Sequence, residues 1–479
     1  MNICMVTSEA VPFAKSGGLA DVATSLSVAL GSLQHDVRLM LPLYGLVDDE
    51  EFERLSLSVT VDIAHATHTV KFLSRSYEGI TVYLVDHPYF RTRGGIYGET
   101  SHTPYNDNLL RFVLFSKAVA ELVKALKWKV DILHAHDWTT GFLTSVIAND
   151  PFFKHTKTVY TIHNLAYQGE FPPLDFLLTN LTYSESMFRG KGPKKKVNMM
   201  AHALETFDAL TTVSPSYAKE IQTEEQGCSL DGILRSRSED LSGILNGIDL
   251  HAWDPETDPL ISFNYSHSDM SGKWKNKESL QKRFHLKVDP SIPVIGMISR
   301  IAEQKGFVEL LQGSPSTLEQ ILTDFPIQMV VVGTGDAALE EKLITLSELH
   351  DNLSVQLIFS NEAAHLVEAG SDFFFMPSRY EPCGLNQMYS LRYGTIPIAR
   401  KTGGLGDSIV DIKNGDGTGI LFDELSGVSM YEAIKRAVVL YTQGVEPISS
   451  IRKRGMAVDF SWLNSADMYI RVYQELLKR

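Results

Sequence analysis

Two glycine-rich segments of similar sequence, one near each end of the chain, have the residues of an anion-binding turn. Residues 14–22 read AKSGGLADV and residues 401–407 read KTGGLGD, so Lys, both Gly, Leu and Asp recur in order. The first segment lies between an apolar run at 3–6 and an apolar-periodic stretch at 19–33, which predicts strand, turn and helix. The N–H groups and helix dipole at such a turn favour an anion. The alternative is a structural turn in which glycine only supplies a positive φ.

Two further segments place charged side chains directly after apolar runs. In 299–306 (SRIAEQKG), Arg300 and Lys305 could converge on a diphosphate, the guanidinium as a fork of donors and the ammonium as a point charge. In 379–386 (RYEPCGLN), Gly384 would open a helix whose N-terminus favours an anion. A solvated loop is the alternative for 299–306.

The segment 134–138 (HAHDW) carries two histidines and an aspartate at the end of an apolar run. Residues two apart on a strand share a face, which invites a metal hypothesis. No third ligand stands at a useful spacing, so we predict no metal site. Asp137 is better placed to bind a ligand hydroxyl. His163 and Asn164 end another apolar run, where they either cap the strand or direct a dipole at a developing positive centre.

Two other chemistries are weaker alternatives. Cys383 could be a nucleophile, but no His with an Asn or Asp partner is signalled near it, so packing is the favoured role. Asp137 and Glu381 could form a hydrolytic carboxylate pair, although they come from different halves of the chain.

The elements that must position these residues alternate between short apolar runs and amphipathic helical stretches, which is typical of a parallel α/β sheet. Ligands of such sheets collect beyond the carboxyl ends of the strands. The predicted strands occupy 3–6, 36–42, 59–63, 69–74, 81–85, 131–138, 158–162 and 210–214, then 293–298, 328–335, 355–359, 372–377 and 396–399. The polar residues just after predicted strands are Lys15, Asp137, His163, Asn164, Arg300, Lys305 and Glu381. A polar, proline-containing stretch at 253–259 is the candidate linker.

Length and composition limit the class of protein. A chain of 479 residues predicts two or three domains, and a net charge of −14 argues against nucleic acid or an anionic membrane as the main partner. The three cysteines are far apart, so neither a disulfide framework nor a zinc site is indicated. The sequence shows no secretory signal and no run near the ~18 apolar residues that span a bilayer. We expect a cytoplasmic protein.

Taken in order, the motifs resemble those of the bacterial glycogen synthases and plant starch synthases, glycosyltransferase family 5, which use ADP-glucose. The resemblance covers nearly the whole chain and rests on 15–21, 136–138, 163–164, 246–249, Arg300 with 304–306, 381–385 and 402–405. It implies an α/β fold of two Rossmann-like domains facing across a deep cleft, the glycosyltransferase B fold. It also implies an N-terminal acceptor-side domain (1–244), a C-terminal nucleotide-sugar domain (245–456) and a last helix (457–479) that crosses back.

The activity implied by the resemblance is transfer of glucose from ADP-glucose to the non-reducing 4-hydroxyl of an α-1,4-glucan such as glycogen, with retention and without a metal or other cofactor. UDP-glucose as donor and a non-catalytic glucan-binding protein remain alternatives. A dinucleotide oxidoreductase is disfavoured because no G-x-G-x-x-G follows the first strand.

The resemblance also assigns roles to residues. The implied catalytic residues are Lys15, Asp137, His163, Arg300, Lys305 and Glu381. The implied substrate-binding residues are Gly17, Gly18, Asp21, Tyr97, Asn164, Asn246, Cys383, Gly384, Leu385, Asn386, Thr402, Gly403 and Gly404. Asn386 departs from the family pattern, which usually has Thr there. Tyr389 stands where other retaining glycosyltransferases have a second Glu, so the ribose or base must be contacted differently.

Overall fold

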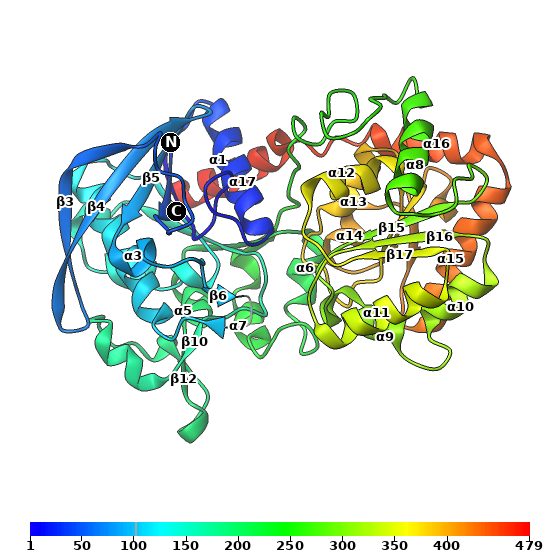
Figure 1. Cartoon of the computed structure of the whole chain (residues 1–479). Coiled ribbons are helices and arrows are strands. Elements are labelled where there is room, and N and C mark those ends of the chain that lie inside the picture. Colours follow the sequence, from blue (N-terminus) through cyan, green and yellow to red (C-terminus); the bar gives the residue numbers. More distant parts are fainter. Residues whose placement is uncertain (101–102) are drawn as a thin grey trace. The chain divides into compact units, whose positions relative to one another are not determined.

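The chain folds into two compact units, seen in a computed structural model that describes residues 1–100 and 103–479 (Figure 1). Unit 1 comprises Met1–Gly247 and Trp462–Arg479, and unit 2 comprises Ile248–Ser461. The chain therefore passes from one unit to the other twice, at 247–248 and at 461–462. Both units are α/β, as the alternating sequence pattern predicts.

The main sheet of unit 1 has nine strands among the described residues, and seven of them are parallel. Their order is β14 (Leu241–Gly243), β13 (Ala209–Thr212), β9 (Lys157–Ile162), β8 (Ile132–His136), β1 (Asn2–Val6), β2 (Asp36–Pro42), β5 (Ile80–Asp86), β4 (Ala66–Tyr77) and β3 (Glu53–Ile63). The last two add an antiparallel hairpin to the edge. Two small antiparallel sheets pair β6 (Gly98–Thr100) with β7 (Thr103–Pro104), and β10 (Glu170–Phe171) and β11 (Phe188–Arg189) with β12 (Lys196–Asn198).

The helices of unit 1 are α1 (Gly18–Ser32), α2 (Pro88–Arg91), α3 (Asn108–Ala125), α4 (Leu143–Ile147), α5 (Met199–Thr206), α6 (Pro215–Glu220), α7 (Asp231–Ser236) and α17 (Trp462–Lys478). Although α17 is the last helix of the chain, it lies beside α1 (Figure 1). Apolar residues recur along one side of α1, where Leu19, Val22, Leu26 and Leu30 are buried. This spacing explains why the segment after the first glycine turn is helical.

Unit 2 is built on a parallel sheet with strand order β17 (Leu353–Gln356), β16 (Gln328–Val332), β15 (Val294–Ile298), β18 (Phe373–Met376), β19 (Ile396–Arg400) and β20 (Ile420–Phe422). Alternate residues of its central strands join two separate hydrophobic clusters. Ile295 and Met297 belong to one cluster, and Val294, Val330 and Val332 belong to the other. Both faces of the sheet are therefore buried, which explains the nearly continuous apolar runs in the sequence.

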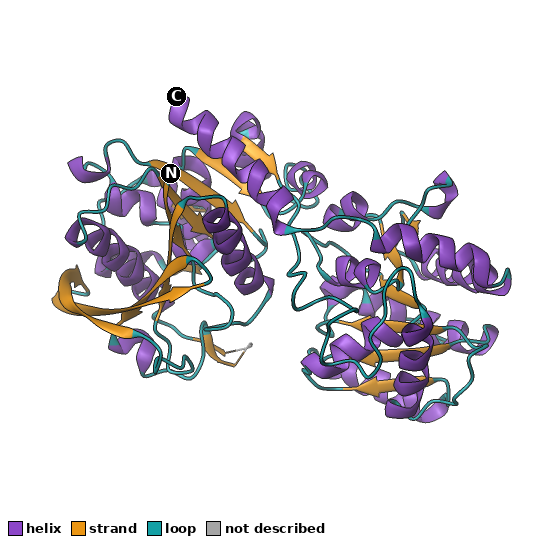
Figure 2. Cartoon of the chain, turned by 90° about the horizontal axis from the view of Figure 1, so that it is seen from above, coloured by secondary structure: helices purple, strands orange, loops and turns teal. Residues whose placement is uncertain are grey.

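Helices cover both faces of this sheet (Figure 2). They are α8 (Ser271–Arg283), α9 (Phe307–Leu311), α10 (Thr317–Asp324), α11 (Ala337–Leu349), α12 (Asn361–Gly370), α13 (Asn386–Arg392), α14 (Gly403–Ser408), α15 (Gly427–Thr442) and α16 (Val445–Met456). The predicted strand at 355–359 ends earlier, at Gln356. Strands β14 and β20 were missed because each has only three residues.

The stretch predicted as a linker, 253–259, is instead a packed part of unit 2. The indole of Trp253 is stacked between the rings of His365 and Tyr389, with both ring centroids 3.8 Å away. Asp258 is fully buried and accepts hydrogen bonds from His365 Nδ1 at 2.8 Å and from the Tyr393 hydroxyl at 2.6 Å. The polar, proline-containing composition led to a wrong prediction because the buried Asp258 carboxylate is hydrogen bonded inside the fold.

Candidate active site

The first glycine turn joins β1 to α1 as the sequence predicts. Gly17 is the N-cap residue of α1, and no side chain caps the helix there. The Lys15 ammonium lies 2.8 Å from Asp21 Oδ1 in the first turn of α1. Burial raises the pKa of Asp21, and the Lys15 ammonium opposes this rise. Lys15, Gly17, Gly18 and Asp21 are thus neighbours at one turn, and Lys15 is paired within the protein.

The residue that organises this turn, Glu9, was not predicted from the sequence. Its carboxylate accepts hydrogen bonds from the backbone N–H groups of Ser16 at 2.5 Å and Gly17 at 3.0 Å, and from the Ser16 hydroxyl at 2.8 Å. The Tyr97 hydroxyl donates to the same carboxylate at 2.5 Å. An anion therefore does occupy the N–H groups at 16 and 17, but it belongs to the protein. The signal was a lone Glu shortly after an apolar strand.

Asp137 follows β8 with an unusual backbone, at a φ of 55°, a region in which non-glycine residues are uncommon. Its Oδ1 accepts a hydrogen bond from the His163 N–H at 2.8 Å. Burial raises the pKa of Asp137 to about 7, against hydrogen bonds from the His163 and Asn164 N–H groups, and the Glu9 charge raises it further. Asp137, His163 and Asn164 are thus brought together at the carboxyl ends of β8 and β9. The Asn164 carboxamide oxygen accepts from the Ala166 N–H at 3.0 Å, as in the capping alternative.

A row of buried histidines supports His163. His136 Nδ1 lies 2.9 Å from His163 Nε2, and the rings of His134 and His136 are stacked with centroids 4.3 Å apart. His134 Nδ1 is 2.7 Å from the Tyr473 hydroxyl of α17, and its Nε2 is 2.6 Å from Thr161 Oγ1. Burial lowers the pKa of His134 and of His163 to about 3, so both rings are neutral near pH 7. Both nitrogens of His134 are hydrogen bonded, which leaves neither for a metal.

Asn246 is the remaining predicted residue of unit 1. Its side chain is buried after β14, and its Oδ1 finds no hydrogen-bond partner among the described residues. Buried polar atoms without a partner are rare in folded proteins. The Asn246 carboxamide therefore has the hydrogen-bonding capacity to contact a bound molecule.

In unit 2 the structure brings Lys305 and Glu381 into direct contact. Lys305 follows β15 and Glu381 follows β18, which pairs with β15 in the sheet. The Lys305 ammonium lies 2.6 Å from Glu381 Oε2, and the two side chains are 19% and 8% exposed. The Ser378 hydroxyl donates to the same oxygen at 2.9 Å. A cation and a carboxylate, both mostly sheltered from water, therefore form the centre of this site.

Arg300 lies on the same loop as Lys305 and stays exposed. One of its guanidinium nitrogens donates to Gln304 Oε1 at 2.8 Å. Gly306 ends the loop with a φ of 81°, and a Cβ there would lie 2.0 Å from the carbonyl oxygen of Pro377. The glycine is thus required both by backbone conformation and by close packing.

The second glycine segment packs directly on the loop after β18. A Cβ at Gly403 would lie 2.0 Å from the Glu381 carbonyl oxygen, and one at Gly404 would lie 2.0 Å from that of Cys383. The Gly404 N–H donates to the Glu381 carbonyl at 3.1 Å. These glycines, after Thr402 at the N-cap of α14, permit backbone contact with the Glu381 loop. Close packing, a structural role, explains their presence without an anion.

The residues from Cys383 to Asn386 lead into α13. Gly384 has a φ of 69°, and Leu385 is the N-cap residue of α13. Cys383 is buried, which agrees with a packing role. The Asn386 side-chain N–H group donates to the Ile298 carbonyl at 2.6 Å, so it ties the start of α13 to the end of β15. Its side-chain nitrogen is thus engaged within the protein, and the substrate contact of Asn386 stays a prediction.

Comparison with known proteins decides the family. Residues 2–236 match the family described as starch synthase catalytic domain, and residues 278–440 match glycosyl transferases group 1. A glycogen synthase of Treponema denticola is 40% identical over 100% of this chain and 99% of its own length. A glycogen synthase of Myxococcus xanthus is 42% identical over 100% of both chains.

The chain belongs to the glycogen synthase family. As a member, it is an enzyme, a glycosyltransferase, as the motifs predict. The catalytic domain of starch synthase IV from Arabidopsis thaliana, solved with ADP and acarbose, matches it with a TM-score of 0.90 at 30% identity, covering 100% of this chain and 99% of that one. The predicted two-domain glycosyltransferase B fold is therefore confirmed. Sucrose-phosphate synthase from Thermosynechococcus elongatus, at 16% identity and a TM-score of 0.63 over 100% of this chain and 99% of its own, shares the fold.

In this glycogen synthase family member, Tyr389 packs within unit 2. Its ring lies flat on Trp253 at an interplanar angle of 10°, and the side chain is buried. The residue therefore anchors the 253–259 stretch to α13.

One exposed aromatic side chain in unit 2 was not identified from the sequence. Phe359 is 90% exposed and lies three residues after the carboxyl end of β17. Burying an aromatic ring is favourable, so a ring left this open at the ligand-bearing edge of a sheet is a candidate contact for a planar group. Its position in the predicted strand at 355–359 hid its exposure.

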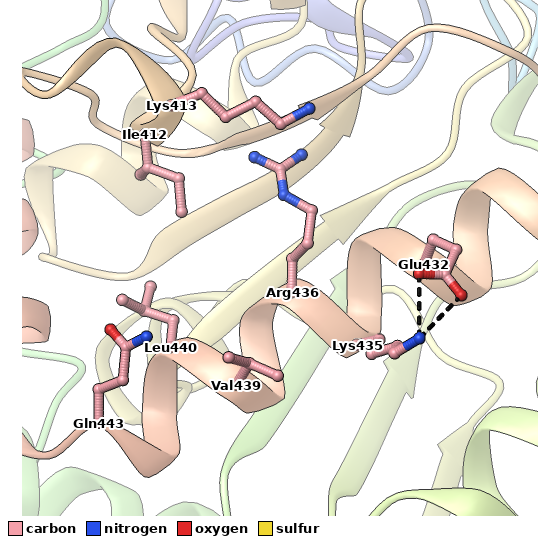
Figure 3. A pocket seen from close by; sticks show the side chains of 8 residues that line it. All are labelled: Ile412, Lys413, Glu432, Lys435, Arg436, Val439, Leu440 and Gln443. Atoms are coloured by element: carbon pink, nitrogen blue, oxygen red, sulfur yellow. Dashed lines mark hydrogen bonds and ion pairs between the residues drawn. The ribbon is translucent and has the colours of Figure 1, made fainter.

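A cavity of about 350 Å³ lies away from these residues, between α15 and the turn at 412–413 (Figure 3). Its lining consists of Ile412, Lys413, Glu432, Lys435, Arg436, Val439, Leu440 and Gln443, and includes none of the predicted site residues. Among the described residues, no cluster of three His, Cys, Asp or Glu side chains could hold a metal. The helices of the described part of the chain are all too short or too polar to cross a membrane.

Proposed function

We propose that this member of the glycogen synthase family transfers glucose from ADP-glucose to the non-reducing 4-hydroxyl of an α-1,4-glucan, with retention of the anomeric configuration and without a metal or other cofactor. The observation that carries the proposal is the sheltered Lys305–Glu381 pair, with Arg300 on the same loop. These groups can balance a departing diphosphate and hold sugar hydroxyls at once.

The choice of donor is supported by the Arabidopsis starch synthase, which was solved with ADP and acarbose. We assign the donor to unit 2, where the diphosphate would draw Lys305 partly away from Glu381. The freed carboxylate oxygens would then accept hydrogen bonds from glucose hydroxyls. Phe359 offers a face on which the adenine ring could stack.

We assign the acceptor to unit 1. In the proposed reaction the bond between glucose C1 and the diphosphate oxygen breaks, and a bond from C1 to the acceptor O4 forms on the same face. The proton of the acceptor hydroxyl passes to the departing diphosphate, so no protein nucleophile is needed. Asp137, with its pKa near neutrality, would hold a sugar hydroxyl, and Lys15 would add positive charge near the phosphates.

The mechanism depends mainly on charge stabilisation in the transition state. Negative charge grows on the diphosphate as its bond to glucose breaks. Fixed cations lower the barrier only if they bind the diphosphate more strongly in the transition state than in the ground state. Lys305 meets this condition because Glu381 and the surrounding loops already hold it in place.

The deciding experiment supplies glycogen with ADP-glucose or UDP-glucose labelled in the glucose and counts the label in the polymer. We expect incorporation from ADP-glucose, in linkages that an α-1,4-specific hydrolase releases. Preference for UDP-glucose would revise the donor only. Incorporation from neither donor would overturn the proposed function.

A further inference from the structure

Glu9 has the contacts of a residue that shapes the active site through its neighbours. We propose that Glu9 is a positioning residue whose carboxylate acts as an internal anion, fixing the turn that carries Lys15. The inference rests on the proposed function and deepens it by assigning how the turn is held. The Glu9 side chain is 3% exposed and directs both oxygens at groups of unit 1.

The bonding of Glu9 is nearly complete and comes mainly from one turn. Oε2 accepts from the N–H groups of Ser16 and Gly17, while Oε1 accepts from the hydroxyls of Ser16 and Tyr97. Among the described residues Glu9 forms no ion pair, so N–H and O–H dipoles alone balance its charge. Hydrogen bonds to an ionised carboxylate are stronger than those between neutral groups, so this arrangement is stiff.

The donors at this carboxylate stay protonated. Burial raises the pKa of Tyr97 well above its ordinary value, and the Glu9 charge raises it further, so the phenol remains a donor. The same hydroxyl is 2.9 Å from Ser8 Oγ. Tyr97, predicted to bind substrate, thus has its hydroxyl committed to Glu9 and Ser8.

The chain before Lys15 is held as well. The N–H groups of Ala10 and Ala14 donate to each other's carbonyls at 2.9 and 2.8 Å, which closes a small loop next to Glu9. Lys15 therefore lies between two fixed points, the Ala10–Ala14 pair and the Glu9–Ser16 contacts. Its backbone has little freedom, and the ammonium can exchange Asp21 for a phosphate without reshaping the turn.

This arrangement changes what the turn contributes to catalysis. Because Glu9 already takes the N–H groups at 16 and 17, these groups cannot bind the diphosphate. We assign the main contribution of the turn to the Lys15 ammonium instead, so most of the effect of Glu9 should depend on Lys15 being present. This dependence distinguishes positioning from a general structural role.

A double-mutant cycle on the full chain tests the dependence. Glu9→Gln, Lys15→Ala and the combined variant are compared by kcat/KM for ADP-glucose and by the Kd of ADP from titration calorimetry. We expect Glu9→Gln alone to lower kcat/KM by about 10- to 100-fold, since a neutral amide offers one acceptor where the carboxylate offers two. In the Lys15→Ala background the same change should cost less than about threefold. Glu121→Gln, which changes a partly exposed carboxylate on α3 that pairs with Lys124, is the matched control and should leave kcat/KM unchanged.

Ser16→Ala provides a second route if Glu9→Gln fails to fold. It removes one hydrogen bond to Glu9 and keeps the carboxylate, so a smaller loss is expected, which should also vanish with Lys15→Ala. Losses that multiply in the combined variants, or unchanged activity of the single variants, would overturn the inference alone. A wild-type protein that neither transfers glucose nor binds ADP would overturn the proposed function and this inference with it.

Discussion

Replacing Lys305 by alanine removes the cation that we assign to the departing diphosphate. An ammonium and one phosphate charge about 4 Å apart interact by roughly 4 kcal/mol at an effective dielectric near 20. Removing one preorganised donor from such a site typically costs about 100- to 1,000-fold in kcat. Lys305 is mostly sheltered, so we expect Lys305→Ala to lose at least about 2 kcal/mol of transition-state stabilisation, or about 30-fold in kcat/KM for ADP-glucose.

The same change leaves Glu381 without its cation, so stability must be separated from chemistry. We expect a loss of about 1–3 kcal/mol in unfolding free energy, because the Ser378 hydroxyl is then the only hydrogen-bond partner that the carboxylate keeps among the described residues. Label incorporation is therefore measured well below the melting temperature of the variant. An added small primary amine should restore part of kcat by filling the vacated place.

The matched control is Lys342→Ala, an exposed lysine on α11, which should behave as wild type. Near-normal kcat/KM in Lys305→Ala, with a normal response to donor concentration, would refute the charge argument. A loss that follows the melting temperature alone, with no rescue by amine, would also refute it.

Three further outcomes are expected. Phe359→Ala should raise the KM for ADP-glucose about 10-fold with little change in kcat, because base–aromatic stacking is worth about 1–3 kcal/mol; an unchanged KM would exclude Phe359 as the adenine contact. Gly404→Ala should lower the melting temperature, since the added Cβ meets the Cys383 carbonyl oxygen at 2.0 Å and overpacking costs about 1–3 kcal/mol; calorimetric scans check this. Burial raises the pKa of Glu368 to about 8 from an ordinary 4.5, so the folded protein holds a proton that the unfolded chain releases, and stability should fall as pH rises through that window. Denaturant titrations at several pH values should show a smaller decrease of the unfolding free energy with pH for Glu368→Gln than for the wild type. An equally steep decrease in the variant would contradict the assignment.

The sequence predicted the class of fold well because burial leaves a regular trace. Strands covered on both faces read as apolar runs, so β15, β16 and β18 were found near their observed positions. Local composition led to a wrong prediction where contacts between residues far apart in the sequence determine the structure. The polar stretch at 253–259 was predicted to be a linker, yet the aromatic rings that hold it come from α12 and α13, more than a hundred residues away.

The candidate site shows the same difference between what the local sequence predicts and what tertiary contacts determine. Lys305 and Glu381 were both selected from their positions after strands, but their direct contact depends on β15 and β18 being neighbours, which the order of strands along the chain does not reveal. Glu9 was missed because a single carboxylate after a strand carries no motif. Its role depends on residues 16 and 17, which fold back to contact its carboxylate, and on Tyr97, which is 88 positions away.

The place of α17 has a consequence for how the protein is made. A ribosome releases the chain from its N-terminus, so unit 2 emerges in full before residues 462–478 appear. Until then His134 lacks the Tyr473 hydroxyl, and the row of rings that ends at His163 lacks its far support. The nascent chain should therefore complete its second unit before its first, and the acceptor-side residues should reach their final arrangement only at the end of synthesis.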